Sequence, residues 1–197
     1  MIGYLFGEIS ILDPTLFIID VGGVGYEVRI SLNTYSKLKQ IKKGKVYTYL
    51  HVKEDAHTLY GFHSSDEKSL FVQLISISGV GPSTAILMLS SMDPAEIKEA
   101  IARADVVTIK KVKGIGLKTA ERIVLELKDK IRKEITGEKI IDVIPDSFNV
   151  IREEALIALV TLGIQKSMAE KSVNIILKNA DKDITLEEVI KLALKTA

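Results

Sequence analysis

The sequence predicts an α+β protein built from several small domains: an N-terminal β-barrel, a central all-helical domain and a C-terminal domain of three short helices. Three observations support this class. Residues 1–63 alternate apolar and polar side chains in short runs rich in β-forming residues. Residues 64–136 carry apolar residues at helical spacing. Residues 137–148 show no hydrophobic period and separate the first two segments from a second helical segment at residues 149–197. A chain of 197 residues is long enough for two or three such domains.

The composition excludes several classes of protein. The chain has no cysteine, which rules out disulfides, thiolate zinc sites, iron–sulfur clusters and cysteine nucleophiles. Hydrophobic residues make up 47% and charged residues 27%, a balance typical of a globular chain. No apolar run approaches the roughly 20 residues needed to span a bilayer, and the N-terminus lacks a basic segment followed by an apolar one, so we expect a soluble, cytoplasmic protein with no membrane partner.

Residues 1–63 are expected to form five or six short strands. A glycine-rich turn at Gly22–Gly25 and a charged turn at Lys53–His57 each join two of them. A short polar stretch precedes the fourth strand. The strands are predicted at Ile2–Leu12, Thr15–Val21, Tyr26–Ile30, Val46–Val52 and Thr58–Phe62. So many strands in about 60 residues favour a small closed barrel of the OB-like kind.

Residues 64–136 are expected to be all helical. One apolar stripe follows the spacing i, i+3, i+4, i+7 and i+11, and a shorter stripe precedes it. The segment Asp93–Glu96 combines an N-cap residue, a proline at the first helical position and a glutamate three residues after the cap, which together predict a helix start. The stripes consist of Ala120, Ile123, Val124, Leu127 and Ile131, and of Leu70, Phe71, Leu74 and Ile75.

Residues 137–148 are predicted to be a linker, because they hold a glycine, a proline and no strong period. Beyond it, a helix is expected from about Val150 to Leu162, ending at Gly163. Capping boxes at Ser167–Glu170 and Thr185–Glu188 predict the starts of two more helices. Residues 149–197 would therefore form a three-helix domain that is only marginally stable because of its size.

A repeat within the helical domain indicates how the protein acts. Gly79–Ala85 and Gly114–Ala120 both read Gly-aliphatic-Gly-x-x-Thr-Ala, 35 positions apart, and an apolar helical segment precedes each copy. The glycines allow tight backbone turns, and the helix that starts within each copy offers unsatisfied N–H groups and the positive end of its dipole. Two helix–hairpin–helix units therefore predict two anion sites suited to phosphates.

Local charge agrees with phosphate binding, although the net charge of the chain is only +1. Residues 110–133 contain nine basic and three acidic side chains, an excess of +6, which makes them a candidate phosphate-binding surface. A lysine-rich solvated helix face is the alternative interpretation. Nucleotide binding fits less well, since neither copy has the Lys-Ser/Thr of a P-loop or follows a strand as a dinucleotide motif does.

These features together resemble the RuvA family of bacterial Holliday junction proteins. The similarity runs over nearly the whole chain in the same order, and the helix–hairpin–helix units alone would indicate only sequence-independent DNA binding. The motifs that carry the resemblance are Gly22–Val28, the Glu54-Asp55 pair before Leu59–Phe62, Gly79–Pro82, and Gly114–Gly116 with Lys118–Arg122.

The resemblance implies roles for particular residues. The hairpin backbones would hold DNA phosphates, with cationic side chains adding to the attraction, and such contacts read no sequence. Ser83 and Leu117 stand where many relatives have a basic residue, so we expect the contacts at these two positions to come from the backbone. Glu54 and Asp55 match the family's acidic pin, which projects at the junction centre. The DNA-binding residues implied are Gly79, Val80, Gly81, Ser83, Gly114, Ile115, Gly116, Lys118, Thr119 and Arg122.

The resemblance also implies partners. Four subunits would form a plate whose symmetry matches a four-armed junction, as one tetramer or as two stacked face to face. Residues 149–197, a UBA-like three-helix domain, would recruit the RuvB ATPase, and the RuvC resolvase is a further partner. The chain itself would be a non-catalytic subunit with no cofactor, because ATP and magnesium would be used by the motor.

Two other functions stay open from the residues themselves. A glycosylase or nuclease could use the same DNA clamp, although the aspartate nearest the second hairpin that could serve a glycosylase, Asp129, lies in a charged helix. A single-strand binder would need aromatics on an exposed barrel face, where Tyr47 and Tyr49 are the candidates and are more typical of packing. His51, His57 and His63 recur every six residues, a spacing that does not favour a metal site.

Overall fold

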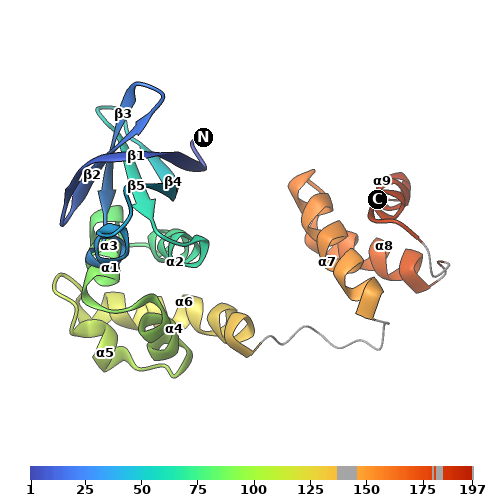
Figure 1. The fold of residues 1–197 in the computed structure, drawn as a ribbon. Helices are drawn as coiled ribbons and strands as arrows, with labels where there is room; N and C mark the ends of the chain where they lie inside the picture. The colour runs from blue at the N-terminus through green and yellow to red at the C-terminus, as the bar shows by residue number, and fades with distance from the viewer. Residues whose placement is uncertain (137–145, 179, 181–183, 197) are drawn as a thin grey trace. The chain divides into compact units, whose positions relative to one another are not determined.

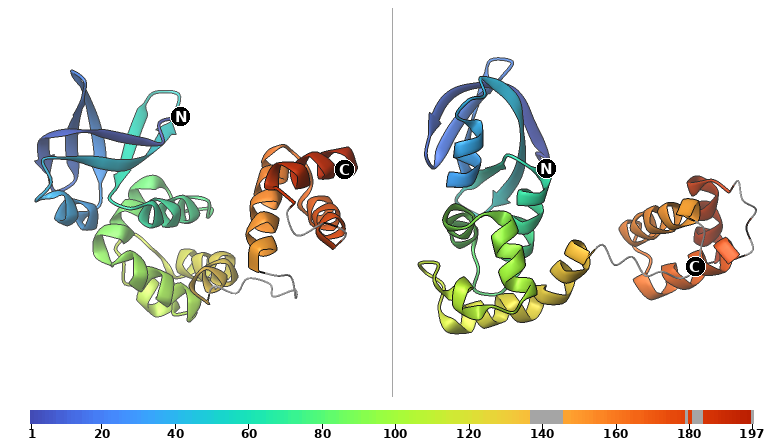
Figure 2. Two further views of the ribbon diagram at one scale, coloured as in Figure 1. Left: turned by 45° about the vertical axis from the view of Figure 1, so that its right-hand side comes forward. Right: turned by 60° about the horizontal axis from the view of Figure 1, so that its bottom comes forward.

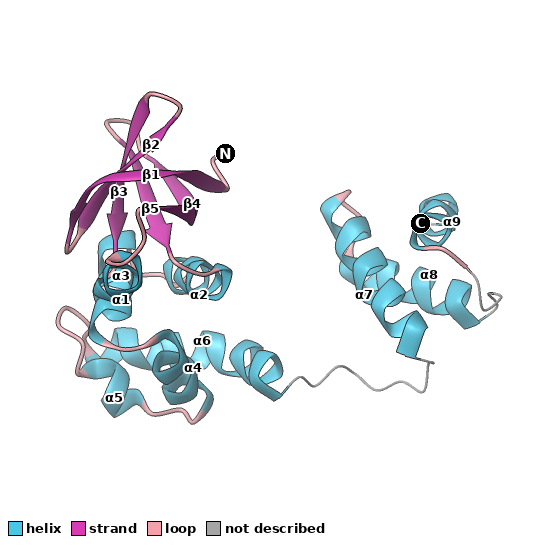
Figure 3. Ribbon diagram, in the orientation of Figure 1, coloured by secondary structure: helices cyan, strands magenta, loops and turns pink. Residues whose placement is uncertain are grey.

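The computed structural model describes residues 1–136, 146–178, 180 and 184–196. These residues fall into two compact units, residues 1–138 and residues 139–197. The first unit contains a five-stranded barrel and a set of helices, and the second contains three helices (Figures 1 and 3). The predicted fold class is confirmed: a small closed barrel, a central helical region with two hairpins, and a C-terminal three-helix unit.

The barrel closes in the strand order β1-β2-β3-β5-β4, with β4 returning to β1 (Figure 2). Neighbouring strands are antiparallel except β3 and β5, which are parallel, as expected where a longer connection separates two strands. Inward-facing apolar side chains such as Phe17, Ile19 and Val28 fill the interior. The strands are β1 (Tyr4–Asp13), β2 (Leu16–Val21), β3 (Val24–Ile30), β4 (Lys43–Val52) and β5 (His57–Phe62).

A helix occupies the short polar stretch between β3 and β4. This helix, α1 (Leu32–Leu38), begins at Ser31, whose hydroxyl accepts the N–H of Thr34 at 3.0 Å. Thr34 and Leu38 are buried, so the helix is held by tertiary packing and its short polar sequence gives no periodic signal. No helix was predicted for this stretch.

The central helices carry the predicted stripes on their buried sides. Asp93 and Glu96 form the expected capping box at the start of α4, and the stripe of α6 from Ala120 to Ile131 is buried throughout. The helices are α2 (Ser65–Ile75), α3 (Pro82–Ser91), α4 (Pro94–Ala102), α5 (Val106–Lys110) and α6 (Leu117–Thr136).

The barrel has its own core, and the end of β5 joins the core of the central helices through Tyr60 and Phe62. Phe71 of α2 packs against Phe62 and Tyr60 of β5, with ring centroids 4.9 and 5.3 Å away. Tyr49 of β4 also meets Phe71 edge to face at 5.4 Å. Aromatic pairs in these geometries add to the stabilisation from burial. The barrel is therefore joined to the helices by a packed aromatic cluster.

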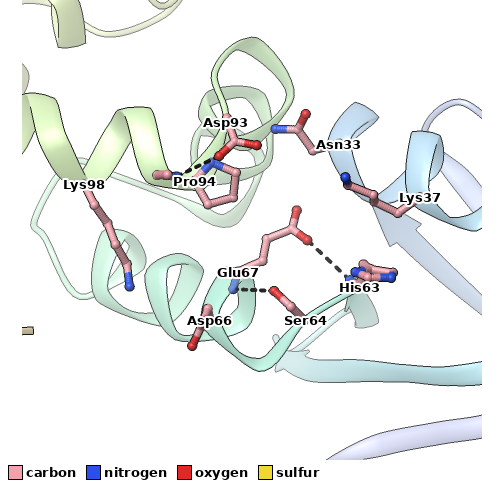
Figure 4. Close-up of a pocket in the computed structure, with 10 residues that line it drawn as sticks. Asn33, Lys37, His63, Ser64, Asp66, Glu67, Asp93, Pro94 and Lys98 are labelled. Carbon is pink, nitrogen blue, oxygen red and sulfur yellow. Dashed lines mark hydrogen bonds between the residues drawn. The ribbon is translucent and has the colours of Figure 1, made fainter. Parts of the chain in front are cut away.

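A buried carboxylate reinforces this joint. Glu67, only 4% exposed, accepts the hydroxyls of Ser31 at 2.6 Å and Thr34 at 2.7 Å, and the N–H of His63 at 3.3 Å. Its side chain lies beside an open hollow of about 290 Å³ that α1, α2 and α4 line (Figure 4). All three donors belong to the barrel side of the joint, so one carboxylate ties α2 to α1 and to the end of β5.

Replacing Glu67 by alanine is expected to lower the free energy of unfolding by about 2–4 kcal/mol, because two buried hydroxyls lose their acceptor. Urea denaturation would measure the change, with Glu99→Ala as the control because Glu99 is exposed and pairs only with Arg103 on the same helix. Equal stability of the two variants would show that the carboxylate is not needed at the joint.

The second unit consists of α7 (Asp146–Thr161), α8 (Lys166–Lys178) and α9 (Leu186–Thr196). The helix expected from Val150 begins four residues earlier, within the predicted linker, whose residues 137–145 lie outside the described part of the chain. Ala155, Leu159, Val173 and Val189 are fully buried in its core.

One of the two C-terminal capping boxes forms. Thr185 and Glu188 exchange the expected hydrogen bonds at the start of α9. The box at Ser167–Glu170 was wrong, because α8 already begins at Lys166 and the carbonyl of Gln165 accepts its first N–H groups. Glu170 instead lies 3.9 Å from the ammonium of Lys166.

Candidate nucleic-acid interface

The two repeated hairpins have the same backbone geometry. In the first, between α2 and α3, the N–H of Val80 donates to the carbonyl of Ile77 at 3.0 Å. In the second, between α5 and α6, the N–H of Ile115 donates to the carbonyl of Val112 at 3.1 Å. Gly79 and Gly114 have φ of +92° and +88°, a conformation that strains any residue with a side chain. The sequence repeat is therefore a structural repeat.

Each hairpin leads directly into a helix whose first N–H groups are free of side-chain caps. Gly81 occupies the cap position of α3 and makes no side-chain hydrogen bond, and Gly116 stands in the same place before α6. The first helical hydrogen bonds run from Ala85 to Gly81 and from Ala120 to Gly116, each at 3.0 Å. The N–H groups before them point out of the helix end, where an anion can accept them.

The predicted hairpin residues divide into anchors and exposed positions. Val80 and Ile115 are each 5% exposed, so their side chains hold the hairpins to the core and only their backbone can face a ligand. Ser83 and Lys118 are exposed and Thr119 is half-buried. Leu117 is 50% exposed, an apolar side chain at the mouth of the second hairpin.

Arg122 connects the two hairpins. It lies on α6, after the second hairpin, and its Nη1 donates to the carbonyl of Ser78 in the first hairpin at 3.3 Å. Its Nε also lies 3.8 Å from Glu126. The first hairpin approaches the start of α6 at another point, where a Cβ placed on Gly79 would lie 4.0 Å from the hydroxyl of Thr119. The hairpins therefore support one another.

The second hairpin is also fixed from its other side. Asp105 caps α5 by accepting the hydroxyl of Thr108 at 2.6 Å and its N–H at 3.0 Å. These hydrogen bonds lower the pKa of the Asp105 carboxyl below its usual value, because they stabilise its ionised form. Ala104, just before it, has a φ of +58°.

One basic residue near the first hairpin was not found from the sequence. Arg29 is exposed on β3 and lines the same surface hollow as Ser83 and Ile86 of α3. The barrel thus supplies a guanidinium on the side where the hairpin sequence has a serine. A single arginine in a strand gives no signal of this, because the proximity arises from the packing of barrel and helices.

Glu54 and Asp55 lie at the tip of the loop that joins β4 to β5. The N–H of Lys53 donates to the carbonyl of Ala56 at 2.9 Å, which closes the loop. All residues from 53 to 56 are exposed. Two adjacent carboxylates therefore project from the barrel.

The alternative functions find less support in the described residues. Among them no group of three or more His, Asp or Glu side chains is arranged to hold a metal ion. Asp129 is exposed on α6. Tyr49 packs against Phe71, as a structural residue would. No described helix has the length and apolarity needed to cross a membrane.

A closed OB-like barrel joined to two helix–hairpin–helix turns is typical of DNA-binding proteins. Family models refine this class. The RuvA N terminal domain matches residues 1–61, the SAM-like helix-hairpin-helix tandem matches residues 71–129, and the RuvA C-terminal domain matches residues 150–197.

Full-length relatives agree with the family models. Proteins named Holliday junction branch migration complex subunit RuvA are 53% identical in Cytophaga hutchinsonii, 50% in Amoebophilus asiaticus and 43% in Bacteroides fragilis. Each alignment covers 99% of this chain and at least 99% of the relative. The chain belongs to the RuvA family, as its motifs predicted.

Proposed function

We propose that this chain binds four-way junction DNA without sequence specificity, holds the junction open and planar, and recruits the RuvB ATPase for branch migration in recombination and repair. The observation that supports this most strongly is the pair of hairpins. They share one backbone geometry and each presents an uncapped helix start, in a chain of the RuvA family.

Each hairpin would hold one stretch of DNA backbone. Backbone N–H groups at Gly81, Ser83, Gly116 and Lys118 would donate to phosphates, and the Lys118 ammonium would add charge. Arg29 would supply the cation near Ser83. Because these contacts involve phosphates and not base edges, the same subunit can follow a junction through any sequence.

The carboxylates of Glu54 and Asp55 would act by repulsion. In the proposed tetramer, eight of them would surround the centre of the junction and oppose the stacking of arms there. The chain itself would carry out no chemical step and need no cofactor, since ATP and magnesium belong to the motor. RuvC and a second, stacked tetramer are further proposed partners.

The C-terminal unit would contact the motor through exposed apolar side chains. Ile157, Leu162 and Ile175 are 68%, 61% and 62% exposed, although they belong to a unit with its own filled core. Because a contiguous apolar patch is typical of a contact with another protein, we propose that these three side chains contribute to one such patch.

A binding competition tests this function. The purified protein is offered a labelled four-way junction against unlabelled linear duplex and single strands of the same sequence at moderate salt. We expect strong preference for the junction. Equal binding to duplex and junction would show a general DNA binder and remove the open-junction mechanism.

Neutralising the two pin carboxylates in Glu54→Gln/Asp55→Asn should tighten junction binding by roughly tenfold at low salt and have little effect at high salt. A carboxylate and a phosphate about 10 Å apart repel by about 0.4 kcal/mol in water, so the loss of about three or four such repulsions in the proposed tetramer gives the roughly 1.4 kcal/mol of a tenfold change. Salt screens these repulsions over about the same distance. Asp13→Asn/Glu187→Gln removes the same charge from two positions outside this loop and serves as the control. Equal tightening in both variants would indicate a net-charge effect only.

A further inference from the structure

The outer face of the barrel carries a set of aromatic and basic side chains, which we call the aromatic–lysine ladder. Tyr4 and Phe6 on β1 and Lys43 and Lys45 on β4 are exposed, and Tyr47 on β4 is partly buried against the core of the central helices. The strands pair Tyr4 with Tyr47 and Phe6 with Lys45, so these side chains share one face. Leu5 and Val46, which alternate with them, are buried in the barrel core.

The ladder is more exposed than packing requires. Tyr4 and Phe6 are each 56% exposed, although the interior beneath them is already filled by Leu5, Val46 and Phe17. Both rings thus leave apolar surface in contact with water, and nothing in the barrel core depends on their size.

The lysines are held at the rings. The Lys45 ammonium lies 4.3 Å from the centre of the Tyr4 ring and 4.8 Å from that of Tyr47, and the Lys43 ammonium lies 5.9 Å from that of Phe6. Glu8 lies 4.0 Å from Lys43, at one end of the ladder. Cation–π contacts of this kind fix rings and positive charges side by side.

We propose that the aromatic–lysine ladder binds single-stranded DNA, independently of the hairpins. Bases would stack on Tyr4 and Phe6, and the backbone phosphates would pair with Lys43 and Lys45. Rings two residues apart on a strand are about 6.8 Å apart, so each can hold its own base. Stacking platforms beside basic side chains are how sequence-independent single-strand binders work.

Charge and shape favour this ligand. Duplex DNA keeps its base faces inside the stack and offers the rings nothing to contact. A second copy of the chain would cover the two lysines and leave their charges without water, which costs free energy unless acids meet them. Only an unpaired strand brings both exposed base faces and phosphates.

Binding of a fluorescent oligothymidylate to the full chain, followed by anisotropy, tests the proposal. We expect Tyr4→Ala/Phe6→Ala to bind it about tenfold more weakly or worse than Ile11→Ala. Ile11 is on the same strand and 49% exposed, and serves as the matched control. Thermal unfolding followed by circular dichroism establishes that both variants fold. Equal affinity of the two variants would overturn the proposal.

Light scattering and junction binding of the same variants distinguish single-stranded DNA from a second copy of the chain as the ligand of the ladder. If Tyr4→Ala/Phe6→Ala changes the oligomeric state, the ladder is a contact between copies and the proposal is overturned. If the variant keeps its oligomeric state and its junction affinity while losing the oligothymidylate, the ladder is a separate single-strand site. Failure of the proposed function would appear instead as a wild-type chain without junction preference.

A spectroscopic signal can report stacking directly, because the chain contains no tryptophan. Tyr4→Trp would place one indole in the ladder, and we expect oligothymidylate to quench its emission over the concentrations that raise the anisotropy. Ile11→Trp should not respond. Unchanged emission of Tyr4→Trp at saturating oligothymidylate would contradict base stacking at this position.

Discussion

Replacing Gly81 and Gly116 together by alanine is expected to weaken binding to a four-way junction about ten- to a hundredfold, with no loss of stability. Both glycines stand at helix starts, and a Cβ at either would meet no atom of the protein within 4 Å. Gly81 has a φ of −88°, which any residue adopts. The fold itself therefore does not require glycine at these positions, so we expect the substitutions to affect DNA binding and not folding.

A methyl group on each helix start would keep phosphates from the N–H groups, and charge-assisted hydrogen bonds of this kind are worth about 1.5–3 kcal/mol. Anisotropy with a labelled junction would measure the loss of affinity. Denaturation should show a free energy of unfolding unchanged or raised by up to about 1 kcal/mol. Full affinity in the double variant would mean that DNA does not approach the hairpins there.

Gly79 and Gly114 serve as the comparison, because replacing them by alanine should lower the free energy of unfolding as well as the affinity for the junction. Their positive φ makes alanine cost about 1–2 kcal/mol of stability at each position. Affinity and stability should fall together in Gly79→Ala/Gly114→Ala, whereas only affinity should fall in Gly81→Ala/Gly116→Ala.

Lys118→Met and Arg122→Met are expected to weaken junction binding by different routes. Lys118 is exposed and would pair with phosphate, so its loss should reduce the slope of log affinity against log salt by about 0.9 for each contact removed. Arg122 donates to the carbonyl of Ser78, so its loss should loosen one hairpin against the other and lower affinity at every salt concentration, with the slope unchanged.

Titrations of labelled junction over a range of salt concentrations separate the two. Leu125→Ala, which removes an 81% exposed side chain from the same helix, provides the control. A reduced slope in Arg122→Met would make Arg122 a phosphate contact, as the sequence predicted.

Much of the fold could be predicted from sequence because its signals are local. The stripe from Ala120 to Ile131, the Asp93–Glu96 cap and the duplicated glycines each reflect a short-range rule. Helix α1 was missed because its stability comes from distant partners. Asn33 donates to the carbonyls of Leu89 and Met92 at 2.6 and 2.9 Å, across more than 50 residues of sequence.

The candidate site was likewise only partly predictable from the sequence. Its glycines were visible as a repeat, but the position of Arg29 beside Ser83 and the bond from Arg122 to Ser78 depend on how separate elements pack. The exposure of Tyr4 and Phe6 was equally hidden, since an aromatic residue in a strand is more often buried than exposed.

The aromatic joint between barrel and helices has a mechanical consequence. Phe62 of the barrel packs against Phe71 of α2, and the Glu67 carboxylate accepts a hydrogen bond across the joint. Only two residues separate the end of β5 from the start of α2. No long linker therefore separates the barrel from the helices. If a motor draws DNA past the hairpins, the force on the hairpins is transmitted to the barrel. The acidic loop then keeps its position relative to the DNA strands, because no hinge separates it from the hairpins.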